Sequence, residues 1–285
     1  MNDNNIIAIK RIQIKGLWGY KDFDIPLDSK VNILAGINGS GKTTIFNIIE
    51  GMATRQMNGV KKLIQDATIH LTSHNDTSRH ISYPNDYENS PKIQNLVKIN
   101  TFDVPIKDKR KISKDRNQLD VELQELIDGN VNESNFVKLD SKLNSEIIKA
   151  YEQADNNVAQ KKKEIIPHFL RLINSFFRET EKQIKFTEDK NIFIQSHNNN
   201  RLKINQLSAG EKQLLIILFT IFLQEQKPYI VLLDEPEISL HLSWQEKLID
   251  TILAINPNCQ LLIATHSPSI FGMGWGDKFI NIDKL

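Results

Sequence analysis

The segment from Gly36 to Thr44 constrains this chain most, because it reads GINGSGKTT and fits the pattern G-x-x-x-x-G-K-[ST] in full. An apolar run, Val31 to Ala35, precedes it, and a helical pattern, Thr44 to Ile49, follows. A strand, a glycine-rich loop and a helix in this order point backbone N–H groups and a helix N-terminus at one anion. The sequence therefore predicts a loop that holds the phosphates of a nucleoside triphosphate.

The residue types in this loop suggest ATP and Mg²⁺ as its ligands. Lys42 can reach the β- and γ-phosphates, and Thr43 can offer its hydroxyl to Mg²⁺. The glycines let the backbone curl around the phosphates. The predicted nucleotide-binding residues here are Gly36, Asn38, Gly39, Ser40, Gly41, Lys42, Thr43 and Thr44.

Two further apolar runs end in residues that can do chemistry. Tyr229 to Leu233 leads into Asp234 and Glu235, and Leu261 to Thr265 leads into His266. Runs without polar alternation are typical of parallel strands buried on both faces, whose carboxyl ends collect ligands. We expect Asp234 to hold Mg²⁺, mostly through water, Glu235 to polarise the attacking water, and His266 to contact the γ-phosphate.

His266, and a serine that precedes another apolar run, also have a purely structural interpretation. His266 could cap a helix that begins at Ser267-Pro268. Ser208 is placed to cap the helix that carries the apolar run from Leu214 to Leu223, with Glu211 at the capping-box position three residues later.

Taken together, these motifs resemble those of the ABC-type ATPases. In this resemblance, the glycine-rich loop is the Walker A motif and the strand that ends in Asp234 and Glu235 is Walker B. The segment from Asn205 to Gln213 is the signature, and the strand that ends in His266 carries the switch motif. The sequences DEPEISLH after Leu233, THSP after Ala264 and IQIKGLWGYKDF near the N-terminus resemble the RecF-like and OLD-like branch, which is related to SMC proteins. The resemblance implies an α/β P-loop NTPase of ABC type, with a mixed sheet flanked by helices. It also implies a homodimer in which two ATP molecules are sandwiched head to tail, and Ser208 and Gly210 of one copy complete the site of the other.

The motifs lie at the two ends of the chain and predict a split ATPase core, 1–55 and 200–285, around an insertion lobe, 56–199, of strands and then helices. The insertion is too short, and its heptads too few, for the long coiled coil of cohesin-like relatives. Pro167 is expected to break or start a helix within it. The strand-like segments are Ile6–Ile14, Tyr20–Leu27, Lys61–Leu71, Gln94–Val104, Gln183–Phe186, Asn191–Gln195, Leu202–Ile204 and Lys278–Ile282, and the helical stretch is Asn117–Phe177.

Composition sets limits on location and partners. The chain has 285 residues, a net charge of +1 and one cysteine, Cys259, which excludes a disulfide framework. The N-terminus lacks the pattern of a signal peptide, and no stretch approaches a membrane span. We expect a cytoplasmic protein without a membrane contact, and no room for the Toprim nuclease of many OLD-like chains.

Weaker features leave alternatives open. Trp18 and Tyr20 could stack on adenine or serve ordinary packing. In the resembled family, a segment called the Q-loop supplies a glutamine that contacts the metal. Neither Gln94 nor Gln118 is a convincing candidate for this glutamine. The basic runs 107–116 (Lys107 to Arg116) and 161–163 (Lys161 to Lys163) could bind nucleic acid or form solvated faces.

The favoured function is an ATP-dependent dimerisation switch in DNA repair or antiphage defence, acting with a protein effector such as a nuclease. The alternative is the nucleotide-binding subunit of an ABC transporter, although the sequence after Glu235 differs from the transport type. A third reading is a module that uses ATP only to assemble. The presence of both Glu235 and His266 argues against it.

Overall fold

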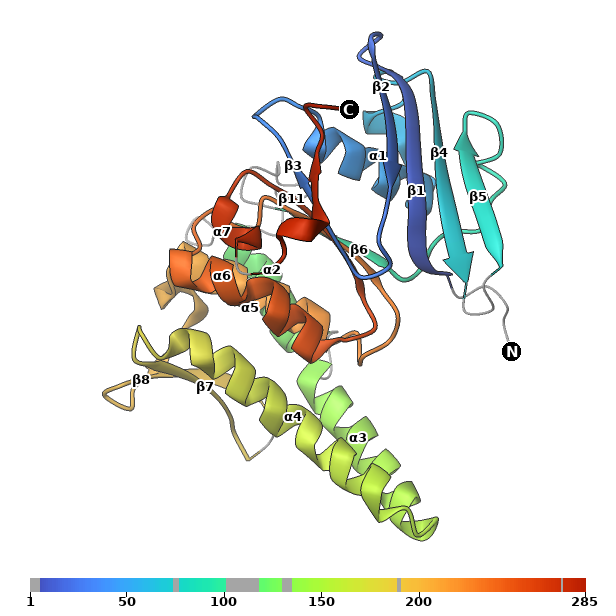
Figure 1. The fold of residues 1–285 in the computed structure, drawn as a ribbon. Coiled ribbons are helices and arrows are strands. Elements are labelled where there is room, and N and C mark those ends of the chain that lie inside the picture. The colour runs from blue at the N-terminus through green and yellow to red at the C-terminus, as the bar shows by residue number, and fades with distance from the viewer. Residues whose placement is uncertain (1–5, 74–76, 101–117, 130–134, 189–190, 273) are drawn as a thin grey trace. The chain divides into compact units, whose positions relative to one another are not determined.

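The computed structural model describes residues 6–73, 77–100, 118–129, 135–188, 191–272 and 274–285 (Figure 1). Backbone contacts divide the chain into two compact units. The strand-rich unit comprises Met1–Asp103, Gln226–Ile238 and Gln245–Leu285, and the helical unit comprises Val104–Glu225 and Ser239–Trp244.

A five-stranded parallel sheet forms the centre of the strand-rich unit. Its strand order is β12(Phe279–Asn281), β3(Val31–Ala35), β11(Gln260–Thr265), β10(Ile230–Asp234) and β6(Leu96–Ile99). Every residue of β3, β10 and β11 is buried, which confirms the predicted doubly covered strands. The carboxyl ends of these strands therefore meet at one edge of the sheet.

A second, antiparallel sheet lies in the same unit. Its order is β2(Lys21–Pro26), β1(Ile6–Leu17), β4(Asp66–Ser73) and β5(Ser78–Tyr83), of which β5 was not predicted. One hydrophobic core joins this sheet, the helix α1(Lys42–Thr54) and the parallel strands, and it includes Ile12, Phe46, Ile69 and Leu232. The predicted α/β class with a P-loop NTPase core is confirmed. Instead of one mixed sheet, however, the unit has one parallel and one antiparallel sheet.

Strand pairing divides the chain differently from the predicted insertion 56–199. β4 pairs with β1, and β6 pairs with β10, so both lie in the strand-rich unit. The edges of β1 and β10 offer backbone groups that must be hydrogen-bonded when buried, and β4 and β6 satisfy them. The signature helix α5(Ala209–Phe222) is instead part of the helical unit.

Helices dominate the helical unit, and Figure 1 shows two of them, α3 and α4, side by side as a hairpin. Stacked aromatic rings fill its core, with the ring centroids of Phe169 and Phe222 3.8 Å apart. Its elements are α2(Gln118–Asp128), α3(Asn135–Glu152), α4(Asn156–Phe177), α5, and the small sheet of β7(Lys182–Phe186), β8(Ile192–Ser196) and β9(Arg201–Leu202). The remaining helices are α6(Leu242–Ile255), α7(Pro268–Phe271) and the 3-10 turns η1(Met57–Gly59), η3(Ile204–Gln206) and η4(Gly276–Lys278).

The expectation for Pro167 is wrong, because α4 runs through it without a break. An internal proline costs about 3 kcal/mol through a lost hydrogen bond and a steric clash. Burial of one large apolar side chain returns about 1.5–3 kcal/mol, and α4 buries several on one face. These are Phe169, Ile173, Phe176 and Phe177, all at most 1% exposed.

Across the described residues, we find no helix with the length and apolar character needed to span a membrane.

The buried Cys259 gives a direct test of this core. Its side chain is inaccessible, and burial raises the pKa of the thiol to about 11. We predict that a thiol reagent such as dithionitrobenzoate leaves the native protein unlabelled at pH 8 and reacts stoichiometrically in 6 M urea. Fast labelling of the native protein would contradict this placement of Cys259.

Candidate active site

The glycine-rich loop has a backbone shape that favours its glycines. Gly39 and Gly41 adopt positive φ angles of 81° and 110°, a region that L side chains rarely occupy. A Cβ on Gly36 would lie 2.8 Å from Ser40 Oγ and 2.9 Å from Asp283 Oδ1. The loop therefore links β3 to α1 as predicted, and it leaves no space for side chains near Gly36.

Two polar groups in the loop fit an anionic ligand. Lys42 is 4% exposed, and its Nζ donates to the carbonyl oxygens of Gly36 (2.8 Å) and Ile37 (3.0 Å). The hydroxyl of Ser40 is buried and has no hydrogen-bond partner among the described residues. Phosphate oxygens could accept from both groups.

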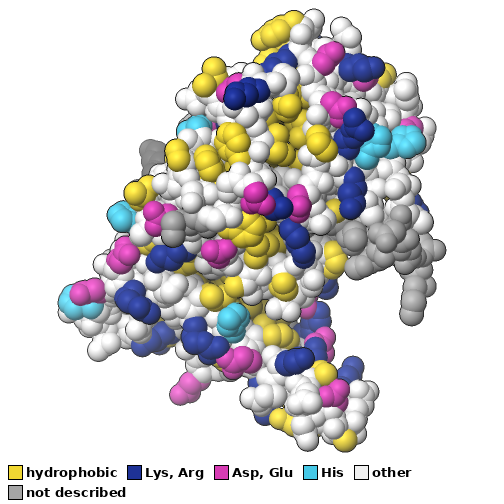
Figure 2. All heavy atoms as spheres, viewed as in Figure 1, with side chains coloured by type: hydrophobic (Ala, Val, Ile, Leu, Met, Phe, Trp, Pro, Cys, Tyr) yellow, Lys and Arg dark blue, Asp and Glu magenta, His cyan; other side chains and the backbone are white. Residues whose placement is uncertain are grey.

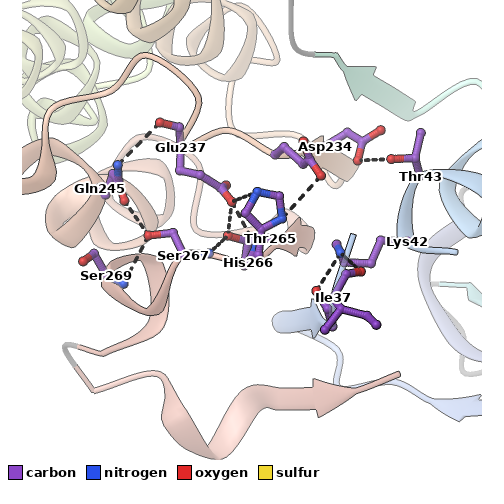
Figure 3. Close-up of polar contacts among 12 residues, drawn as sticks. Ile37, Lys42, Thr43, Asp234, Glu237, Gln245, Thr265, His266, Ser267 and Ser269 are labelled. Carbon is purple, nitrogen blue, oxygen red and sulfur yellow. Dashed lines mark hydrogen bonds and ion pairs between the residues drawn. The ribbon is translucent and has the colours of Figure 1, made fainter. Parts of the chain in front are cut away.

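A hydroxyl and a carboxylate meet beside this loop, as the Mg²⁺ assignment requires. Thr43 Oγ1 donates to Asp234 Oδ1 at 3.0 Å, which joins α1 to the carboxyl end of β10 (Figure 3). Within the described part of the chain, no group of three His, Cys, Asp or Glu side chains could hold a metal. The pair nevertheless fits Mg²⁺, which usually takes one or two protein ligands together with waters and substrate phosphates.

Lys98 is a site residue that sequence analysis missed. It lies on β6, its side chain is 4% exposed, and its Nζ is 3.9 Å from both Asp234 Oδ2 and Glu50 Oε2. Burial raises the pKa of Asp234, whereas Lys98, the hydroxyl of Thr43 and Lys42 oppose that shift. Lys98 thus helps to hold the Walker B carboxylate in its ionised form, and its only sequence signal is a lysine within an apolar strand.

The structure brings Glu235 and His266 together at neighbouring strand ends. His266 Nδ1 lies 3.5 Å from Glu235 Oε1. Glu235 has a positive φ of 50°, unusual for a residue with a side chain, and its N–H donates to Ala264 O. Burial raises the pKa of Glu235, the charges of Asp234 and Glu237 add to this, and His266 opposes it. A carboxylate made more basic in this way is suited to accept a proton from water.

In the helical unit, the signature motif forms the predicted capping box. Glu211 N donates to Ser208 Oγ (3.2 Å), and Ser208 N donates to Glu211 Oε2 (2.8 Å). Burial opposes the charge of Glu211, but hydrogen bonds from Lys182 and Ser208 N keep the pKa of its carboxyl below the usual range. Lys182 and Glu211 thus form one ion pair, at 2.8 Å. Lys212 and Asp120 form another, at 2.7 Å. The two pairs fix the start of α5 against β7 and α2.

The weaker predicted features are only partly described. Residues 107–116 lie outside the described residues. In the run 161–163, Lys162 pairs with Glu146 at 2.6 Å, and Lys163 lies over the ring of Tyr151. On the face shown in Figure 2, basic and acidic side chains are interspersed.

The two predicted adenine contacts differ in exposure. A Cβ on Gly41 would lie 3.3 Å from the Trp18 ring, so this ring packs beside the loop, whereas Tyr20 is 77% exposed. Their stacking on adenine remains a prediction. Gln94 precedes β6 and Gln118 begins α2.

Most of the chain matches a known protein family. Residues 31–272, well over half of it, match the family described as "AAA domain, putative AbiEii toxin, Type IV TA system". The chain belongs to this AAA-domain family. This match agrees with the resemblance of its motifs to those of RecF-like and SMC-related ABC-type ATPase heads.

Individual relatives are more distant. Septu protein PtuA of Bacillus thuringiensis is 23% identical over 296 residues, which cover 92% of this chain and 72% of that protein. The Retron Ec83 probable ATPase of Escherichia coli is 34% identical over 88 residues, which cover 27% of this chain and 16% of that protein. The Retron Vc95 probable ATPase of Vibrio cholerae is 30% identical over 99 residues, 31% of this chain and 19% of that protein. The chain thus spans less than a fifth of either retron ATPase.

Solved structures agree on the fold. An SMC head bound to the C-terminal winged-helix domain of ScpA matches with a TM-score of 0.54 and 17% identity, covering 93% of this chain and 91% of that one. An SMC head from Pyrococcus furiosus with an extended coiled coil matches with a TM-score of 0.52 and 16% identity, with the same two coverages. The AAA domain of this chain therefore has the fold of an SMC head ATPase.

The signature glycine offers a packing test within the helical unit. A Cβ on Gly210 would lie 2.1 Å from the backbone oxygen of Ser239. We predict that Gly210→Ala lowers the free energy of unfolding by about 1–3 kcal/mol, measured by urea denaturation. Gly276→Ala is the matched control, because a Cβ there meets nothing within 4 Å and should cost at most about 0.5 kcal/mol. Equal stability of the two variants would refute the close approach at Gly210.

Proposed function

We propose that this AAA domain hydrolyses ATP with Mg²⁺ and uses ATP-dependent pairing of two copies as a switch. One observation carries the proposal. The Thr43–Asp234 hydrogen bond (3.0 Å) and the Glu235–His266 contact (3.5 Å) lie at the carboxyl ends of adjacent parallel strands, beside the glycine-rich loop. The family match and the names of the retron relatives support ATPase activity.

Each side chain has a role that follows from its contacts. Lys42 would exchange the carbonyls of Gly36 and Ile37 for β- and γ-phosphate oxygens. Thr43 and Asp234 would hold Mg²⁺, which supplies charge neutralisation at the phosphates when bound. Glu235 would orient a water molecule and take its proton as the water oxygen attacks the γ-phosphorus. The bond to the β-phosphate oxygen then breaks, which yields ADP and phosphate.

The pairing of two copies rests on the signature. The described residues carry one glycine-rich loop and one signature helix, so a two-site sandwich needs a second molecule. Ser208 caps a helix whose first N–H groups and partial positive charge suit a phosphate. We propose that Ser208 and Gly210 of one copy complete the nucleotide site of the other.

The proposed cellular setting follows from resemblance. Small RecF-like heads act in DNA repair and in antiphage defence, and the similarity to Septu PtuA over 92% of this chain favours defence. We propose that the ATP-bound pair holds or releases a protein effector such as a nuclease in the cytoplasm. Contact with nucleic acid is part of this proposal as a trigger, tested by adding DNA or RNA to the hydrolysis assay.

Glu235→Gln tests the hydrolysis. The amide keeps the size of the side chain but cannot take a proton, so kcat should fall by about 10²–10³ while ATP still binds. The measurement is phosphate release with Mg²⁺, together with ATP affinity by calorimetry. Glu246→Gln, an exposed position on α6, is the matched control and should keep full activity. Near-normal turnover by Glu235→Gln would exclude Glu235 as the base.

A further inference from the structure

Glu237 is a buried carboxylate next to the site to which sequence analysis gave no role. Its side chain is 7% exposed. Its Oε1 accepts hydrogen bonds from Thr265 Oγ1 (2.6 Å) and from the backbone N–H of His266 (3.0 Å). One carboxylate oxygen therefore fixes the backbone at the end of β11. The segment that begins there with His266 is called the switch loop below.

The same oxygen also faces the ring of His266. Nε2 lies 3.9 Å from Glu237 Oε1, and Nδ1 lies 3.5 Å from Glu235 Oε1, so the ring is set between two carboxylates. The side chain of His266 is 39% exposed, so packing alone leaves much of it unconstrained. Its orientation depends on these polar neighbours.

The position of Glu237 is itself held by a closed circuit of hydrogen bonds, most of which Figure 3 draws. Ser267 N donates to Thr265 Oγ1 (2.9 Å), and Ser267 Oγ donates to Gln245 Oε1 (2.6 Å). Gln245 Nε2 then donates to the backbone oxygen of Glu237 (3.4 Å), which closes the circuit through α6. A carboxylate anchored at both its backbone and its side chain can hold a neighbour in one place.

A glutamine at this position would supply the same acceptor without the cost of a buried charge. The second oxygen, Oε2, is buried and has no hydrogen-bond partner among the described residues. Burying an ionised carboxylate with an unused oxygen costs free energy. The negative charge therefore calls for a function beyond the two hydrogen bonds, and the ring of His266 is the group it faces.

We propose that Glu237 is a positioning residue for His266. Its Oε1 fixes the backbone of the switch loop that follows β11, and its charge acts with that of Glu235 to hold the ring of His266 between the two carboxylates. A ring held in one place can contact the γ-phosphate, so this inference rests on the proposed ATPase function for its consequence in turnover.

Glu237→Gln separates charge from hydrogen bonding. The amide oxygen keeps the bonds from Thr265 and His266 N, so the variant keeps the acceptor and removes the charge. Without the charge, the ring ¹⁵N signals of His266 should shift, because the ring loses one of the two carboxylates that hold it. His266→Gln identifies these signals among those of the seven histidines. The kcat should fall by about 10–100-fold, as when outer partners of site residues are removed, with the KM for ATP within about twofold.

The readouts separate the two proposals. A wild-type protein without hydrolysis would overturn the proposed function, whereas the ring signals would still test the role of Glu237. Unchanged His266 signals and unchanged kcat in Glu237→Gln would overturn that role. If Glu237→Gln does not fold, Thr265→Val replaces it, because valine has a similar shape to threonine and removes both the donor to Glu237 and the acceptor of Ser267 N. His266 signals identical to wild type in Thr265→Val would then overturn the inference.

Discussion

The parallel pairing of β3, β11 and β10 sets the conditions for the rest of the site. Leu34 lies beside Ala264, and Ala264 lies beside Asp234, so the strands end in register at one edge. Segments from positions near 35, 234 and 265 thus converge, although about 200 residues separate the first from the others. The loop, the acidic pair and the histidine depend on this register, because a slip of one residue would turn each side chain to the opposite face.

Charge balance at this edge then decides which groups are ionised. Asp234, Glu235 and Glu237 crowd three carboxylates into a partly dry region, which is costly without nearby cations. Lys42 and Lys98 supply them, one from the loop and one from the edge strand β6. Because β6 adds to β10, the edge strand completes the electrostatics of the site as well as the sheet.

Local signals allowed much of this to be predicted from sequence. The loop between β3 and α1, the buried strands before Asp234 and His266, and the capping box of Ser208 each depend on neighbouring residues in the chain. Lys98, Glu237 and the pairing of β4 with β1 depend on distant partners, and nothing in their local sequence identifies those partners. The error at Pro167 has the same origin, since the burial of Phe169 and Phe176 outweighs a local preference.

The central claim is that two copies share each nucleotide site, and mixing two inactive variants tests it most directly. Lys42→Ala disables the loop of its own chain, and Ser208→Arg disables the signature that its chain offers to a partner. In a shared site, a mixed pair keeps one complete site, formed by the loop of the Ser208→Arg chain and the signature of the Lys42→Ala chain. Random pairing makes half of all pairs mixed, so an equal mixture should recover up to about a quarter of wild-type phosphate release. Activity no greater than the sum of the two variants alone would contradict the shared site.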